Sequence, residues 1–162
     1  MLIKLKNKDT LLVDDFVFKC CVGKKGLNKN KIEGDNSTPR GLFSLGKLYY
    51  RPDRVNKPDT KLKIRRINRN MGWSIDSKSW TYNSEIRINN KIKHEKLFRK
   101  DYKYNYFIVI NYNKKKVSNK GSAIFIHLTK NYSPTIGCIA LKENDFLILA
   151  KILNKKSKIK IY

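Results

Sequence analysis

The sequence predicts a mainly β, sandwich-like fold with one C-terminal amphipathic helix. Most of the chain consists of short apolar or alternating segments separated by turn residues, a pattern typical of sheets. The segment 104–112, YNYFIVINY, has a continuous apolar centre rich in β-branched and aromatic residues, which favours a central strand. Only residues 142–154 change to a helical period. The chain has 162 residues, 40% apolar and 31% charged, so we expect one domain over 1–162.

The N-terminal part predicts three strands. Residues 2–6 alternate between apolar and basic side chains, as a half-buried strand does. Asn7 to Asp9 suit a turn, after which residues 10–13 return as the second arm of a hairpin. Residues 16–22 form a third apolar segment that ends at Gly23.

A long polar loop separates these strands from the next one. Residues 23–41 contain several glycines and one proline, and loops of this length in compact domains are often functional, although a solvated excursion explains the composition equally well. Residues 41–50 then predict a strand with a bulge at Gly46. Residues 61–67 alternate basic and apolar side chains and predict a further strand.

The C-terminal part predicts the helix and a closing strand. Phe146, Leu149, Ala150 and Leu153 recur at helical spacing, with acidic residues in the first turn and lysines near the end, as the helix dipole prefers. The predicted helix therefore covers residues 142–154. The sequence KIKIY at residues 158–162 then predicts the closing strand.

The charge is strongly positive, at a formal net +24. Such a charge attracts polyanions, but the lysines are scattered along the whole chain, which favours a general compositional bias. No recognisable nucleic-acid-binding motif is present, so nucleic acid is not an expected partner. No apolar run approaches the roughly 18 residues of a membrane span, and oligomeric state is not readable.

Residues 1–16 contain no uninterrupted apolar stretch and no small-residue cleavage site, so no secretory signal is visible. From the sequence we expect a chain that stays inside the cell, leaves by a route that the sequence does not reveal, or lacks its own beginning. The three cysteines, Cys20, Cys21 and Cys138, fit neither a disulfide framework nor a zinc site. We expect no metal and no organic cofactor.

The segment 121–141, GSAIFIHLTKNYSPTIGCIAL, has the pattern of a reactive site. His127 closes one apolar run, and Cys138 opens the next after a polar loop. A thiol with a pKa of about 8.5 is mostly protonated at neutral pH, but an adjacent imidazole can accept the proton and leave a thiolate in an ion pair. A buried cysteine with a hydrogen-bonded histidine fits the spacing equally well. His94 is a rival base, or an exposed polar residue.

This segment resembles the catalytic signature of the L,D-transpeptidase (YkuD-type) domain, in which a histidine is followed by a loop and a Ser/Thr-x-Gly-Cys element. Here the element is Thr135-Ile136-Gly137-Cys138. The resemblance runs from about Cys21 to Leu153, in a short, single-domain branch of the family. Other matching segments, in chain order, are Glu33-Gly34-Asp35, Thr38-Pro39-Arg40-Gly41, Tyr50-Arg51-Pro52-Asp53-Arg54, Gly72-Trp73, Tyr82-Asn83 and His94-Glu95.

Two positions depart from the better-known members of the family. Ile136 stands where they carry histidine, and Ala140 stands where they carry an arginine that helps to position substrate. The usual substrate geometry is therefore in question, whereas the nucleophile and its base are retained.

The resemblance implies acyl transfer through Cys138, with His127 as base and the N–H of Cys138, with that of Gly137 or Ile136, holding the oxyanion. Its implied substrate is a peptidoglycan stem peptide, bound through a thioester and passed to an amine, and its implied location is the cell envelope. The open alternatives are a carboxypeptidase or amidase acting on the same polymer, and a non-catalytic basic module. We expect substrate contacts at Thr135, Trp73, Tyr82, His94 and Arg40.

Overall fold

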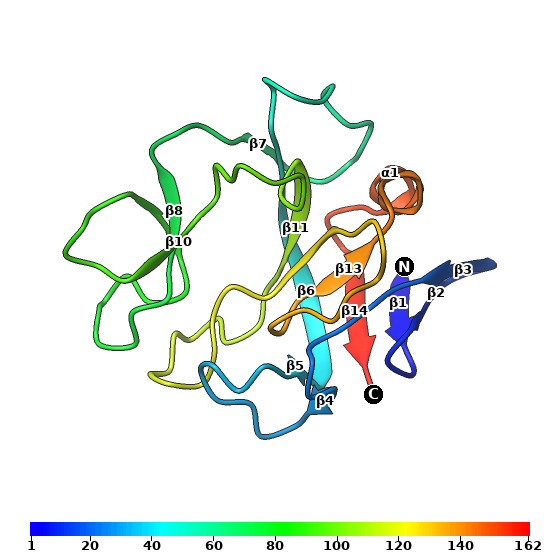
Figure 1. Ribbon diagram of the computed structural model, residues 1–162. Coiled ribbons are helices and arrows are strands. Elements are labelled where there is room, and N and C mark those ends of the chain that lie inside the picture. The colour runs from blue at the N-terminus through cyan, green and yellow to red at the C-terminus, as the bar shows by residue number, and fades with distance from the viewer.

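The computed structural model describes residues 1–162 and is built around a nine-stranded sheet (Figure 1). The strands follow the order β13–β12–β11–β6–β14–β1–β2–β3, and β7 pairs with β6. Their bounds in this order are β13 (Ile139–Leu141), β12 (Phe125–Leu128), β11 (Tyr106–Ile110), β6 (Gly41–Tyr50), β14 (Lys158–Ile161), β1 (Leu2–Leu5), β2 (Thr10–Val13), β3 (Phe16–Lys19) and β7 (Ile64–Arg66).

The two ends of this sheet meet, so it is nearly closed. Just beyond β3, Cys21 donates a backbone hydrogen bond to Ala140 O at 3.0 Å and accepts one from the Ala140 N–H at 2.9 Å. Gly23 and Thr135 form a second bridge nearby. The mainly β, sandwich-like prediction is confirmed, and β13 is joined to the N-terminal part of the chain.

Side-chain alternation gives the sheet two different faces. On β11, Ile108 and Ile110 contribute to an aliphatic core of 25 buried residues that also includes one side of α1. Phe107 and Val109 point the other way, into an aromatic core of 11 buried residues. Because successive strand residues alternate in this way, one strand supplies both layers. Cys138 belongs to the aromatic layer.

The predicted central strand is confirmed, since β11 pairs with β12 on one side and β6 on the other. The predicted bulge also appears on β6, where the pairing register shifts between Leu45 and Leu48. A Cβ on Gly46, inside this bulge, would lie 3.0 Å from Val109 Cβ, so the close approach of the two strands requires glycine.

The helix α1 covers Glu143–Ile152, inside the predicted range of 142–154. Phe146, Leu149 and Ala150 are buried against the aliphatic face of the sheet, as their spacing predicts. Glu143 and Asp145 lie in the first turn, where their charge complements the helix dipole. With ten residues in α1, no helix is long and apolar enough to cross a membrane.

Two small sheets lie outside the large one. The first has the order β10–β8–β9, comprising His94–Lys96, Met71–Ser74 and Glu85–Arg87, and it lies on the opposite side of β11 from α1 (Figure 1). The second pairs β4 (Leu27–Asn28) with β5 (Thr38–Pro39). This pairing joins two parts of the predicted loop 23–41 to each other.

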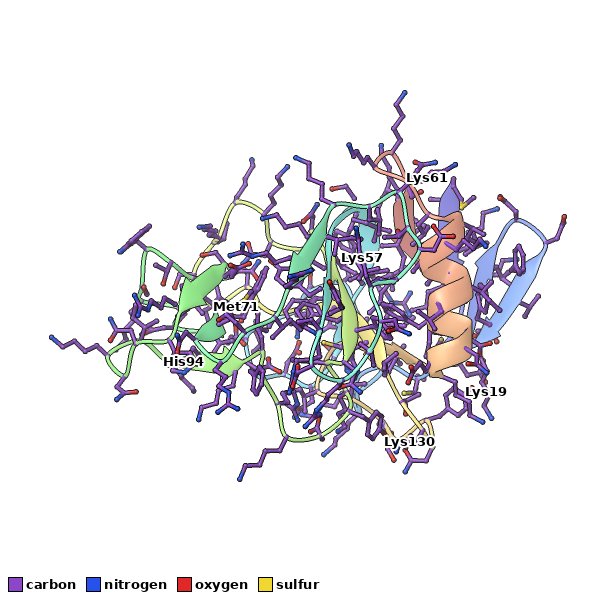
Figure 2. The ribbon with its side chains drawn as sticks, turned by 90° about the horizontal axis from the view of Figure 1, so that it is seen from above. Lys19, Lys57, Lys61, Met71, His94 and Lys130 are labelled. Carbon is purple, nitrogen blue, oxygen red and sulfur yellow. The ribbon has the colours of Figure 1, made fainter.

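Figure 2 shows labelled lysine side chains at well-separated places on the molecule. Lys19, Lys57, Lys61 and Lys130 are all exposed; Lys19 ends β3, Lys57 and Lys61 lie in the loop between β6 and β7, and Lys130 follows β12. This distribution agrees with a scattered charge. It also makes a buried lysine an exception in this chain.

Candidate active site

His127 and Cys138 lie on the same face of the large sheet. β12 and β13 are parallel, and their register pairs His127 with Ala140. Cys138 is two residues before Ala140, so its side chain points to the same side as that of His127.

Both side chains line a cavity of about 510 Å³. Cys138 is 5% exposed and His127 is 7% exposed, so both residues are almost completely buried. The charged residues of the wall are Lys24, Lys31, Glu33, Glu95, Arg99 and Lys103. This lining carries more positive than negative charge and favours an anionic ligand.

The loop before β13 is fixed by hydrogen bonds around the sulfur. Thr135 Oγ1 accepts from the Gly137 N–H at 3.1 Å and donates to Cys138 O at 2.6 Å. Thr38 Oγ1 donates to Gly137 O at 2.8 Å. Gly137 has φ +149°, and a Cβ there would lie 3.0 Å from Ser37 O, so the turn requires glycine.

These bonds decide which backbone donors are available for an oxyanion. The Gly137 N–H is already donated to Thr135. The N–H groups of Ile136 and Cys138 donate to no protein acceptor. Of the backbone donors named from the sequence, these two are free, and the 67% exposed Ile136 side chain lies at the cavity wall.

The Cys138 thiol is held between two backbone groups. Its Sγ donates to Ala123 O and accepts from the Phe125 N–H, both at 3.3 Å. Burial, with a smaller contribution from the Glu95 carboxylate, raises the pKa of Cys138 to about 12. The sulfur therefore keeps its proton at neutral pH.

The His127 ring presents one free nitrogen. Its Nδ1 lies 2.9 Å from Leu128 O, and because a carbonyl can only accept, we assign the ring hydrogen to Nδ1 and the lone pair to Nε2. Burial lowers the pKa of His127 to about 4. The resting pair is thus a neutral thiol and a neutral imidazole, not the ion pair suggested by the sequence.

A buried acid network lies beside this pair. The Tyr104 ring packs edge-on against His127 with centroids 5.5 Å apart, and its hydroxyl donates to Glu95. Arg99 Nη1 approaches the same carboxylate at 3.7 Å. Burial raises the pKa of Glu95, and burial together with this carboxylate raises that of Tyr104.

The long loop 23–41 supplies a second polar network. Glu33 Oε2 accepts from Ser122 Oγ at 2.7 Å and from the Tyr82 hydroxyl. Lys31 Nζ lies 2.6 Å from Asp35 Oδ1. Burial opposes ionisation of Asp35, but hydrogen bonds from Lys31, Ser37 and Ile32 hold its pKa well below the usual value.

Only some of the residues expected to contact substrate line the cavity. Thr135 and Ile136 line the cavity with His127 and Cys138. Tyr82 is 1% exposed, does not line the cavity and acts on it only through Glu33.

Trp73, His94 and Arg40 also lie outside the cavity lining. Trp73 donates to Asn83 Oδ1 at 3.0 Å and packs in the aromatic core. His94 Nδ1 lies 2.7 Å from Ile92 O, on the small sheet near Met71 (Figure 2). Arg40 is exposed beyond β5. A substrate contact at any of the three stays a prediction.

Sequence reasoning gave no role to Lys31, Glu95 or Tyr104, which all line the cavity. The only sequence signal for any of these three residues was that Glu95 lies in His94-Glu95, one of the segments that resemble the family. Ala140, where the better-known members carry arginine, is buried in the cavity wall with its backbone paired to Cys21. No three His, Cys, Asp or Glu side chains are grouped as metal ligands would be.

Two solved structures share the fold over 99% of this chain. One is the helical cell shape determining protein Pgp2 from Campylobacter jejuni, with a TM-score of 0.51 and 20% identity. The other is Bd1075 from Bdellovibrio bacteriovorus, with a TM-score of 0.50 and 16% identity. This chain spans 46% and 47% of their respective lengths. No curated protein sequence matches this chain significantly.

The family assignment comes from the sequence as a whole. A family model described as the L,D-transpeptidase catalytic domain, YkuD, matches residues 3–161. The match includes every strand of the large sheet except the first residue of β1, as well as α1 and the loop that carries the cysteine. The chain therefore belongs to the YkuD family of L,D-transpeptidase catalytic domains.

Proposed function

We propose that this protein is a cysteine-dependent L,D-transpeptidase acting on peptidoglycan stem peptides. The observation that carries the proposal is that a thiol immediately before β13 and an imidazole with a free Nε2 on the adjacent parallel strand β12 line one cavity. Family membership supplies the substrate class. The positive lining suits a stem peptide, whose free carboxylates are anionic.

The first half of the reaction makes a thioester. His127 Nε2 takes the Cys138 proton while sulfur attacks the carbonyl carbon, and the carbonyl electron pair moves to oxygen. The Ile136 and Cys138 N–H groups hold that oxygen. The C–N bond then breaks, the proton passes from His127 to the leaving nitrogen, and a D-amino acid departs.

The second half returns the enzyme. An amine from another stem attacks the thioester carbonyl, His127 accepts the amine proton, and the C–S bond breaks to restore the thiol. Water in place of the amine gives the carboxypeptidase or amidase reaction with the same intermediate. A cell-envelope location follows from this substrate, and fractionation of cells with an antibody against the protein would test it.

Intact-mass spectrometry with a purified tetrapeptide muropeptide tests the proposal. We expect a covalent adduct on Cys138, and chromatography of the products distinguishes a cross-link from a shortened stem. Cys138→Ala and His127→Ala should lose turnover while remaining folded, and Cys20→Ala, which changes a buried sulfur outside the cavity, should retain it. Full turnover in Cys138→Ala would remove the cysteine mechanism, whereas a wild-type protein that gives neither adduct nor turnover would leave the non-catalytic basic module.

A further inference from the structure

Lys31 is a buried cation in the wall of the catalytic cavity. Its side chain is 3% exposed, and the residue lines the cavity together with Cys138. A lysine is almost never fully buried unless it is paired, and its partner here is Asp35. The acyl transfer described above gives Lys31 no role.

Gly121 makes room for the Lys31 side chain, and a Cβ on Gly137 would lie within van der Waals distance of the Lys31 ammonium. A Cβ on Gly121 would lie 3.0 Å from Lys31 Cε, and a Cβ on Gly137 would lie 3.6 Å from Lys31 Nζ. Gly121 belongs to the segment leading into β12, and Gly137 immediately precedes Cys138. The lysine therefore passes between the segments that deliver the base and the nucleophile.

The ammonium keeps a donor for a bound group. Its protein acceptors are Asp35 Oδ1 at 2.6 Å and Ile32 O at 3.5 Å. An ammonium has three N–H groups, so one has no protein acceptor. Asp35 is itself fixed, because the Ser37 N–H and hydroxyl donate to it at 2.9 and 2.7 Å.

The charged side chains near Cys138 act on the pKa of its thiol in opposite directions. Glu95 faces the sulfur from β10 and raises the pKa of Cys138, whereas Lys31 and, less strongly, Arg99 lower it. Arg99 is already paired with Asp101, 2.5 Å from Nη2 to Oδ2. Lys31 and Arg99 are thus the two cations that favour the thiolate, and Lys31 is the one buried beside Gly137, in a site where Ala140 replaces the family's arginine.

We propose that Lys31 supplies the positive charge that stabilises the Cys138 thiolate and the negative oxygen formed when that thiolate attacks a carbonyl. The inference rests on the proposed cysteine chemistry. Lys31 transfers no proton: the thiol proton passes to His127, the carbonyl electron pair moves to oxygen, and the ammonium keeps its three hydrogens. It acts by charge and by one hydrogen bond.

The test measures the thiolate directly, without turnover. Neutral iodoacetamide alkylates thiolates, and its rate against pH reports the pKa of each cysteine. Trypsin releases Cys138 in the peptide 131–142 and Cys20 with Cys21 in the peptide 20–24, so mass spectrometry follows them separately. The second peptide shows whether a variant has opened the fold.

Lys31→Met should slow alkylation of Cys138 about tenfold and shift the pH profile of that alkylation up by about one pH unit. A nearby opposite charge shifts a pKa by about one to three units, and Asp35 offsets part of the effect of Lys31. The value of kcat/KM for the muropeptide should fall about 100-fold. Lys31→Arg should restore at least half of the shift in the profile. Lys29→Met, an exposed lysine on the same loop, should change nothing.

The outcomes separate the two proposals. A wild-type protein that forms no thioester overturns the proposed function, while the alkylation profile still tests the role of Lys31. A wild-type protein that forms the thioester, combined with a Lys31→Met profile and turnover equal to wild type, overturns the role of Lys31 alone. Equal slowing in Lys31→Met and Lys31→Arg, with Cys20 and Cys21 unreactive, shows that charge is not the cause and also overturns it.

Discussion

Replacing His127 with glutamine should reduce the loss of unfolding free energy that the protein suffers as the pH falls. Burial lowers the pKa of His127 from 6.5 to about 4, so the folded protein resists protonation of this ring. The unfolded chain binds the proton near pH 6.5. The stabilisation is therefore complete above that pH, begins to be lost as the pH falls below it, and is fully lost below about pH 4.

The difference between the two pKa values corresponds to about 3 kcal/mol of unfolding free energy. The ring is almost completely buried, so solvent screening does not reduce this value greatly. Carboxylates that titrate in the same range are common to both proteins. Between about pH 7.5 and pH 4, the wild type should therefore lose about 3 kcal/mol more than His127→Gln.

Urea unfolding followed by tryptophan fluorescence measures both proteins across this range. His94→Gln is the matched control, because the chain has two histidines and His94 is partly exposed. The control should follow the wild-type curve. Parallel curves for wild type and His127→Gln would refute the burial argument, and with it the assignment of a neutral imidazole.

Two further substitutions test how the site is supported. Arg51→Met should lower the free energy of unfolding by about 2 kcal/mol, as measured by urea unfolding. Arg51 is 2% exposed, donates to Arg99 O at 2.6 Å and stacks 3.5 Å from the Phe98 ring centre. The control is Arg69→Met, a change at an exposed arginine, which should cost less than about 0.5 kcal/mol. Gly137→Ala should lower the free energy of unfolding by about 2–3 kcal/mol and abolish turnover, because φ is +149° and the new Cβ would meet Ser37 O. The control is Gly34→Ala, which has open space around it and should cost about 1 kcal/mol. Equal losses of stability in thermal melts of the two variants would contradict the steric argument.

The strands with strong local signals were predictable. The predicted strand 10–13 has the bounds of β2, and 41–50 has those of β6, because turn residues flank each of them. The bulge near Gly46 and the core-facing side of α1 also follow from local pattern. The apolar run 16–22 was predicted too long, since β3 ends at Lys19 and the chain turns toward β13.

The arrangement of the site was less predictable. The segments around His127 and Cys138 were visible, but not that β12 and β13 are parallel or that His127 lies inside β12 rather than at its end. The burial of Lys31 depends on Gly121, 90 positions away in sequence, where a Cβ would lie 3.0 Å from Lys31 Cε. No periodicity within a segment encodes a contact of that kind, and the pKa of each buried group depends on such contacts.

The position of β14 affects how the protein matures. This strand lies between β6 and β1, so within the sheet the first three strands reach β6 through residues 158–161. The bridge between Cys21 and Ala140 joins the same N-terminal part of the chain to β13. The large sheet can therefore become continuous from β13 to β3 only after residues 158–161 have been synthesised, so the strands made first are joined to β6 late.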